Sequence, residues 1–180
     1  ITTDRMAAVD ANAAALGVPR KQLMESSGNA VAREVRAVAD PGATVALVCG
    51  RGNNGGDALV AARFLKEYAV AARLLGRPET IRTDIARENW VALERAEYDT
   101  RVVHDSRDLD LGAPDVVVDA MLGTGVTGAL RDPERSAAAA INEADATVVA
   151  VDVPSGVDAD TGEAAGVAVG EDPEVVLRPG

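Results

Sequence analysis

The sequence predicts an α/β fold in which helices cover both faces of a doubly wound, mostly parallel sheet, giving three layers, α/β/α. Short apolar runs bounded by turn residues alternate with segments of helical periodicity, which is the pattern of β-α-β units. The runs lack polar alternation, as expected for strands buried on both faces of a parallel sheet. Polar loops follow three of them, so we expect a ligand site at one edge of the sheet.

Two helices are expected before the first strand. Apolar residues recur at helical spacing over residues 4–16, and Gly17 and Pro19 end this helix. A second apolar stripe covers residues 20–38 and has Gly28 in its middle, either as a weak point or as a close-packing point. We interpret both stripes as core-packing faces and assign no site residue to them.

The remaining elements alternate regularly. Periodicity and turn residues predict a strand at 43–49, a helix from about Asp57, a strand at 70–75, a helix at 84–96, strands at 101–104 and 115–120, a helix at 133–143 and a strand at 147–151. The segment after Gly162 is poor in helical signals. No internal repeat or low-complexity linker occurs, so residues 1–180 are expected to form a single domain.

Composition excludes several classes of protein. Of the 180 residues 47% are hydrophobic and only 2% aromatic, so Val, Ala and Leu must fill the core. A net charge of −11 disfavours nucleic acid and anionic membranes as partners. Cys49 is the single cysteine, which excludes an internal disulfide and a multi-cysteine metal site. With no apolar run of membrane-spanning length and no visible signal peptide, the chain is expected to be soluble and cytoplasmic.

The three polar loops should converge on one site. They are the run rich in glycine and asparagine at 50–57, the Gly-Thr-Gly turn at 123–125 and the Asp-Val-Pro-Ser segment at 152–155. In an open, Rossmann-like sheet, ligands bind outside the carboxyl ends of the strands, where the winding reverses. Glycine amides and a helix N-terminus at this edge would bind a phosphate group.

The first loop alone leaves other interpretations open. Residues 50–55 satisfy the dinucleotide fingerprint GxGxxG, but residues 76–78 (Gly-Arg-Pro) stand where a dehydrogenase would have an acidic residue. The P-loop pattern fails because neither Gly-Lys-Ser nor Gly-Lys-Thr follows Gly55. A tight strand-to-helix turn of this kind also occurs without any ligand.

Five other noticeable residues have ordinary explanations. His104 is expected at the surface or at a sheet edge, Cys49 as a small buried hydrophobe, and Trp90 in packing. Asp158 and Asp160 follow the third loop, where they either cap a turn or contact a ligand.

Three motifs follow one another along the chain: GRGNNGGDALVAARFL, VVVDAMLGTGVTGALRDP and VVAVDVPSGVDADTG. Together with QLMESSG in the second helix, they resemble the YjeF N-terminal domain family, whose enzymes are NAD(P)H-hydrate epimerases. The resemblance covers nearly all of the chain up to residue 162. Beyond this point the chain is shorter than is usual in the family, which makes it either a natural short form or a fragment.

The resemblance implies residues for a substrate and for a potassium ion. In similar enzymes the first two motifs and the aspartate of the third bind the hydrated dinucleotide; here these are Asn53, Asn54, Gly55, Gly56, Asp57, Gly123, Thr124, Gly125, Val126, Thr127, Gly128, Ala129 and Asp152. Potassium (K+) would be held by Asn54, Asp119 and Ser155. An amide, a carboxylate and a hydroxyl supply the oxygen donors that this hard cation prefers.

The implied reaction is inversion at C6 of the hydrated nicotinamide ring, which interconverts the R and S forms of NADHX or NADPHX. Water leaves C6 and returns to the opposite face, and Asp152 is our candidate for the group that donates and recovers the proton. The resemblance also implies an ATP- or ADP-dependent dehydratase as pathway partner and a homodimer. Arg51 and Arg77 are candidates to contact a 2′-phosphate, although arginines on an acidic surface are usually only solvated.

Two alternatives to the epimerase stay open. One is a non-catalytic binding or scaffold module, since this fold also occurs in proteins that resemble the family but use it for association. Asn54, Asp119, Asp152 and Ser155 are all present, which favours the enzyme. The other is an ordinary nicotinamide oxidoreductase.

Overall fold

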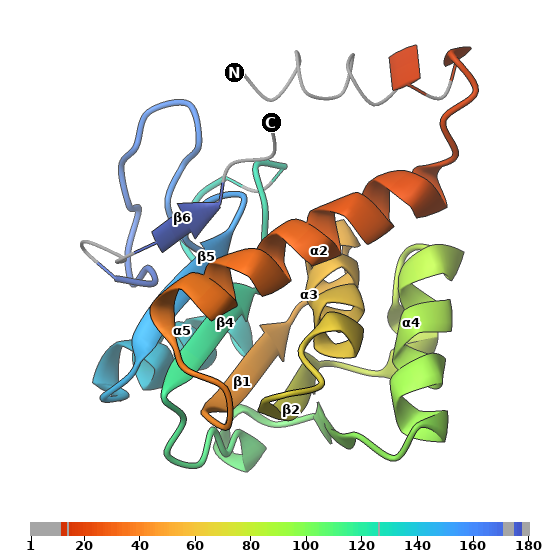
Figure 1. Ribbon diagram of the computed structural model, residues 1–180. Helices are drawn as coiled ribbons and strands as arrows, with labels where there is room; N and C mark the ends of the chain where they lie inside the picture. The colour runs from red at the N-terminus through yellow and green to blue at the C-terminus, as the bar shows by residue number, and fades with distance from the viewer. Residues whose placement is uncertain (1–11, 14, 126, 171–174, 178–180) are drawn as a thin grey trace.

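The computed structural model describes residues 12–13, 15–125, 127–170 and 175–177. Its centre is a sheet of six parallel strands in the order β3-β2-β1-β4-β5-β6. The strands are β1 (Thr44–Cys49), β2 (Ala69–Leu75), β3 (Asp99–Val103), β4 (Val116–Ala120), β5 (Thr147–Val151) and β6 (Val175–Leu177). The winding reverses between β1 and β4, so the predicted doubly wound, Rossmann-like sheet is confirmed (Figure 1).

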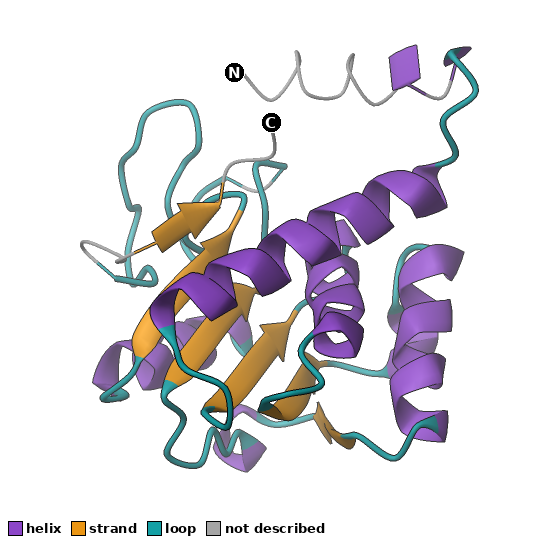
Figure 2. Cartoon of the chain, in the orientation of Figure 1, coloured by secondary structure: helices purple, strands orange, loops and turns teal. Residues whose placement is uncertain are grey.

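Helices cover both faces of this sheet, as predicted. The helices after residue 19 are α2 (Arg20–Val38), α3 (Asn53–Phe64), α4 (Asp84–Arg95) and α5 (Glu134–Glu143), with short 3-10 turns η1 (Pro78–Thr80) and η2 (Ser106–Asp108). Helices α2, α3 and α4 pack on one face and α5 packs on the other, with the strands between them (Figure 2). The fold therefore has the three layers that the sequence predicts.

Each face of the sheet has its own hydrophobic core. In β1, Val45, Leu47 and Cys49 pack toward α2, α3 and α4, whereas Ala46 and Val48 pack toward α5. Successive side chains of a strand point to opposite faces, and here both faces are covered. This explains why the strand sequences are apolar throughout instead of alternating.

Three residues that sequence analysis excluded from the site lie where it placed them. Trp90 in α4 is 1% exposed, within the core. Cys49 is fully buried, and burial raises the pKa of its thiol to about 12, so the thiol stays protonated. His104 is exposed directly after β3.

Gly28 is a close-packing point and not a weak point. It is buried where α2 crosses α3, and a Cβ atom on Gly28 would lie 2.4 Å from Cγ1 of Val60. Gly56 plays the matching role in α3, since its Cβ would lie 2.7 Å from Cε of Met24. The two helices approach closely because each has a glycine at the contact.

The predicted start of the third helix, near Asp57, is wrong because α3 begins at Asn53. The first turn contains two glycines, and because glycine has a low helix propensity, the sequence pattern did not indicate a helix there. The structure requires glycine there all the same: a Cβ on Gly55 would lie 2.0 Å from the carbonyl oxygen of Gly50. Tertiary packing therefore overrides the local preference.

Other differences are small. Strand β3 spans Asp99–Val103 instead of residues 101–104, and the other bounds shift by a single residue or not at all. The short β6 has no counterpart among the predicted elements, since three residues are too few to show a period. The predicted helix at 4–16 lies mostly outside the described residues. In the part of the chain that the structure describes, no helix is long and apolar enough to cross a bilayer.

Replacing Gly50 by alanine is expected to lower the free energy of unfolding by about 3 kcal/mol or more. The new Cβ would lie 1.8 Å from the carbonyl oxygen of Met121, and both partners are backbone, so neither can move without disturbing β1 or β4. Gly52→Ala is the matched control: no atom lies within 4 Å of its Cβ position, and it should cost less than about 1 kcal/mol. Urea unfolding followed by circular dichroism measures both. Equal midpoints for the two variants would contradict the predicted backbone contact.

Candidate functional site

The loops after β1, β4 and β5 meet at the carboxyl edge of the sheet. Between them lies a cleft of about 260 Å³ at the point where the winding reverses. Its lining residues come from these loops, from the segment after η1 and from the start of α5: Arg51, Gly52, Asn53, Asn54, Arg82, Met121, Leu122, Gly123, Thr124, Gly125, Glu134 and Asp152. The predicted convergence of three loops is therefore present.

Asn54 connects the three loops. It lies in the first turn of α3, and its Nδ2 donates hydrogen bonds to the carbonyl oxygens of Leu122 and Val151, each at 2.9 Å. This ties the start of α3 to the loop after β4 and to the last residue of β5. Gly123 makes the approach feasible, since a Cβ there would lie 2.9 Å from both terminal atoms of the Asn54 amide.

Asp119 is the buried polar centre beneath the cleft. It lies in β4, is 0% exposed, and its Oδ2 accepts a hydrogen bond from the Ser155 amide at 2.8 Å. Its Oδ1 accepts from the Ser155 hydroxyl at 2.7 Å and from the Met121 amide at 3.2 Å. Burial raises the pKa of Asp119 to about 6, while these hydrogen bonds oppose the shift. No salt bridge involves Asp119 among the described residues.

Asp152 is held at the wall of the cleft in a strained conformation. It follows β5 directly, and its φ of 74° lies in the left-handed region, which costs about 1 kcal/mol or more for a residue other than glycine. Its Oδ2 accepts a hydrogen bond from the Thr124 amide at 2.7 Å. Its Oδ1 has no hydrogen bond to the described residues, so one carboxylate oxygen is available to a ligand.

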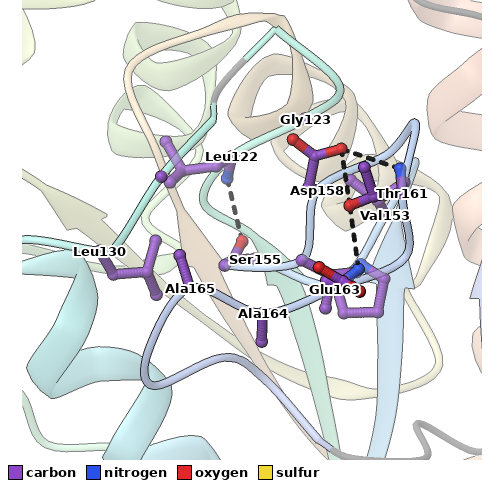
Figure 3. A pocket seen from close by; sticks show the side chains of 14 residues that line it. Leu122, Gly123, Leu130, Val153, Ser155, Asp158, Thr161, Glu163, Ala164 and Ala165 are labelled. Atoms are coloured by element: carbon purple, nitrogen blue, oxygen red, sulfur yellow. Dashed lines mark hydrogen bonds between the residues drawn. The ribbon is translucent and has the colours of Figure 1, made fainter.

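A second cavity, of about 210 Å³, lies between the loop after β4 and the loop after β5. Figure 3 shows its lining, with Leu122 bound to the Ser155 hydroxyl through its amide at 3.1 Å. Leu122 and Gly123 line both this cavity and the cleft, so that short segment is a wall between them.

Asp158 closes the turn at the rim of that cavity. Its Oδ1 accepts hydrogen bonds from the amides of Asp160 and Thr161, at 3.0 and 2.9 Å. These bonds hold the pKa of Asp158 below its usual range. Of the two roles considered for Asp158, the structure therefore shows the turn cap.

The structure brings some of the predicted substrate residues to the cleft and not others. Those in the lining are Asn53, Asn54, Gly123, Thr124, Gly125 and Asp152. Gly55 is buried against the backbone of Gly50, and Gly56 is buried in the contact with α2. Asp57 is half-buried in α3 after its first turn, outside the lining. Gly128 lines the second cavity, Thr127 and Ala129 are exposed, and Val126 lies outside the described residues. The substrate roles of all these residues stay predictions.

Two residues of the cleft lie outside every sequence motif. Arg82 and Glu134 both line it, but neither stands in a motif. Arg82 is brought there by a backbone hydrogen bond from its amide to the carbonyl oxygen of Arg51, at 2.8 Å. Charged residues in loops and first helical turns are common on any surface, so the sequence offers no signal for them.

Hydrogen bonds connect the three residues predicted to bind potassium. Leu122 links Asn54 to Ser155, because its carbonyl accepts from Asn54 and its amide donates to the Ser155 hydroxyl, which in turn donates to Asp119. They supply amide, hydroxyl and carboxylate oxygens, and the carboxylate is buried without a cationic side chain in the described part of the chain. No group of three or more His, Cys, Asp or Glu suited to a metal occurs among the described residues. A donor set with a single carboxylate fits a monovalent hard cation.

The sequence matches a known protein family over most of its length. A profile of the family described as "YjeF-related protein N-terminus" matches residues 20–177. The chain belongs to this family. The resemblance that the three motifs indicate is therefore confirmed.

Two relatives are similar in sequence to this chain over most of its length. The chain is 46% identical to the bifunctional NAD(P)H-hydrate repair enzyme Nnr of Methanothermobacter thermautotrophicus, over 96% of this chain and 34% of that protein. It is 42% identical to the NAD(P)H-hydrate epimerase of Cenarchaeum symbiosum, over 92% of this chain and 78% of that protein. The chain thus spans about a third of the length of the bifunctional relative.

The same fold is present in a solved structure, that of yeast ynu0. The two superpose with a TM-score of 0.83 at 25% identity, over 98% of this chain and 78% of the yeast chain. This agreement supports the three-layer arrangement and the single doubly wound sheet.

Stability should depend on pH through Asp119. Because its pKa is raised from 3.8 to about 6 in the folded state, the unfolded chain loses this proton first as pH rises. The free energy of unfolding therefore falls between about pH 4 and pH 6, by about 3 kcal/mol at about 1.4 kcal/mol per pKa unit. Asp119→Asn is expected to remove this fall, whatever its effect on absolute stability.

The measurement is urea unfolding at several pH values with choline as the only added cation, so that no metal binds the carboxylate. The difference in slope between the two proteins isolates Asp119 from the other acids. Parallel pH profiles would contradict the shifted pKa.

Proposed function

We propose that this chain epimerises hydrated nicotinamide dinucleotides at C6, interconverting (R)- and (S)-NADHX and (R)- and (S)-NADPHX. The observation that carries the proposal is the strained Asp152, whose carboxylate is fixed by the Thr124 amide at the wall of the cleft. Strain of this kind concentrates at functional sites. Relatives that are 40 to 42% identical over most of their length are named NAD(P)H-hydrate epimerases, which supports the same activity here.

The reaction needs proton transfer but no electron acceptor. The ring nitrogen donates its lone pair to C6 as the C6–O bond breaks, and the leaving hydroxyl takes a proton and departs as water. Water then adds to the opposite face of C6, the nitrogen recovers its pair, and the added water releases one proton. Asp152 enters the reaction as a carboxylic acid with the proton on Oδ1, donates this proton to the leaving hydroxyl and recovers a proton from the added water. Atoms and charge are unchanged overall.

The cleft supplies binding groups for the rest of the dinucleotide. The N-terminus of α3 begins at Asn53, within the lining, and its free amides favour a pyrophosphate. Arg51 and Arg82 add positive charge on the same side. Gly52 leaves the backbone open to close approach, since no atom lies within 4 Å of its Cβ position.

Asn54, Asp119 and Ser155 would hold potassium, which would neutralise the buried carboxylate when bound. These residues already order the three loops through their hydrogen bonds. They contribute to catalysis by fixing the position of Asp152 relative to the N-terminus of α3. Correct placement of reacting groups accounts for much of the rate enhancement of an enzyme.

The proposal extends to the neighbouring reaction. A dehydratase driven by ATP or ADP would consume the S epimer, and the bifunctional repair relatives are in line with such a coupling. A homodimer and a cytoplasmic location remain predictions. The scaffold alternative is less favoured, because a surface used only for association has no need of a strained aspartate at a cleft.

Asp152→Asn is expected to lower kcat at least about 100-fold, which is the usual contribution of a general acid-base group. Asparagine tolerates the left-handed conformation and can accept the Thr124 hydrogen bond, so fold and dinucleotide affinity should persist. The assay supplies mixed NADHX epimers with an S-specific dehydratase and follows consumption of the R form. Calorimetry with NADP+ measures binding separately.

Asp145→Asn is the matched control, since Asp145 is exposed and away from the cleft. Full activity in Asp152→Asn would refute the role of Asp152. Persistence of the R epimer with the unaltered protein would refute the epimerase itself.

Potassium is expected to raise the melting temperature relative to tetramethylammonium at equal ionic strength, because that cation is too bulky to be coordinated. A ligand that binds only the folded state stabilises it by mass action. Ser155→Ala should abolish most of the difference, whereas Ser136→Ala, on α5 and outside the cleft lining, should retain it. Identical melting temperatures in both salts would argue against the site.

A further inference from the structure

A basic hollow adjoins the cleft at the carboxyl edge of β1, β2 and β3. It is lined by Arg51, Gly76, Arg77, Thr80 and His104. Arg51 lines both this hollow and the cleft, so the two are continuous through its side chain. A ligand that occupies the cleft can therefore extend into the hollow.

The position of Arg51 is fixed by its neighbours. Gly76 has a φ of +108°, and a Cβ there would lie 2.9 Å from Cδ and 3.2 Å from Nε of Arg51, so the arginine lies directly over this glycine. Nη1 of Arg51 donates to the Thr80 hydroxyl at 3.4 Å, and that hydroxyl donates to the carbonyl oxygen of Arg77 at 2.7 Å. The guanidinium is held over the end of β2 by this contact and not by a carboxylate.

Charge in the hollow is not balanced locally. The whole chain carries −11, and about half of the described arginines pair with acids, as Arg36 does with Glu67 and Arg73 with Asp99. Among the described residues, neither Arg51 nor Arg77 makes a salt bridge. Glu79, the nearest acid in sequence, is outside the lining. Two unpaired guanidinium groups in one hollow favour a small, highly charged anion.

The position of the hollow in the fold indicates which anion it binds. In a sheet of this strand order, the adenosine ribose of a dinucleotide lies beyond the end of β2. An acidic residue there binds the ribose 2′-hydroxyl, and an arginine accommodates a 2′-phosphate instead. Gly76 and Arg77 follow β2 here. The pyrophosphate has its own place at the N-terminus of α3, which leaves the 2′-phosphate for the hollow.

We propose that Arg51 and Arg77 bind the 2′-phosphate on the adenosine of the substrate, so that this chain prefers NADPHX to NADHX. The proposal rests on the proposed epimerase function for its substrate, but the hollow can be tested without turnover. Arg51 positions the phosphate from the cleft side, and Arg77 closes the outer side.

The first test is calorimetry with adenosine 2′,5′-bisphosphate, adenosine 5′-monophosphate and inorganic phosphate. The bisphosphate is expected to bind at least about tenfold more tightly than either of the others, in keeping with two charge-assisted contacts. Arg77→Gln and Arg51→Gln should each remove most of this preference. Arg95→Gln, an exposed arginine in the last turn of α4, removes the same charge elsewhere and should leave it intact.

The second test compares kcat/KM for NADPHX and NADHX in the dehydratase-coupled assay. The ratio is expected to exceed about 10 in the unaltered protein and to fall about tenfold in Arg77→Gln but not in Arg95→Gln. Equal use of both substrates, or an unchanged ratio in Arg77→Gln, would overturn the 2′-phosphate site and leave the epimerase standing. Equal affinity for the bisphosphate and the monophosphate, or binding of inorganic phosphate as tight as the bisphosphate, would also overturn it. Absence of any turnover together with a retained preference for the bisphosphate would refute the epimerase and support the hollow.

Discussion

The candidate site depends on one buried carboxylate. Asp119 is enclosed at the end of β4, and its hydrogen bonds come from Ser155 and from the Met121 amide. Loss of one of these donors would cost folding free energy, because the buried carboxylate would keep an unsatisfied oxygen. The position of Asp119 therefore constrains the positions of its hydrogen-bond partners. Ser155 accepts from Leu122, whose carbonyl accepts from Asn54. One chain of hydrogen bonds thereby runs from the β5 loop through the β4 loop to the first turn of α3.

Close backbone approach is the second condition for this arrangement. Gly50 lies against the carbonyl of Met121, and Gly123 lies against the side chains of Asn54 and Asp152. Without these glycines the three loops could not reach each other, and the chain of hydrogen bonds from Asp119 to Asn54 would not form. The cleft is thus shaped before any ligand arrives, which limits the reorganisation needed on binding.

The fold was predictable because its signals are local. The apolar runs and helical stripes each follow from the periodicity of one segment, and three motifs marked Asn54, Asp119 and Asp152 as the end of a strand or the start of a loop. What the sequence could not show depends on tertiary contacts. Gly56 looked like part of a ligand loop but serves the contact of α3 with α2. The left-handed backbone conformation of Asp152 could not be predicted from the sequence, because aspartate occurs with both negative and positive φ.

Cys49 gives the site an internal reporter. It is the only cysteine in the sequence, and it ends β1 directly before Gly50, with its protonated thiol fully enclosed. Its side chain packs on the face covered by α2, α3 and α4, so an alkylating reagent can reach the sulfur only when these helices separate locally from β1. The rate of thiol labelling therefore measures how often this helical layer opens, without any introduced probe. Ligands that hold α3 against β1 would be detected by slower labelling, even if they are never turned over.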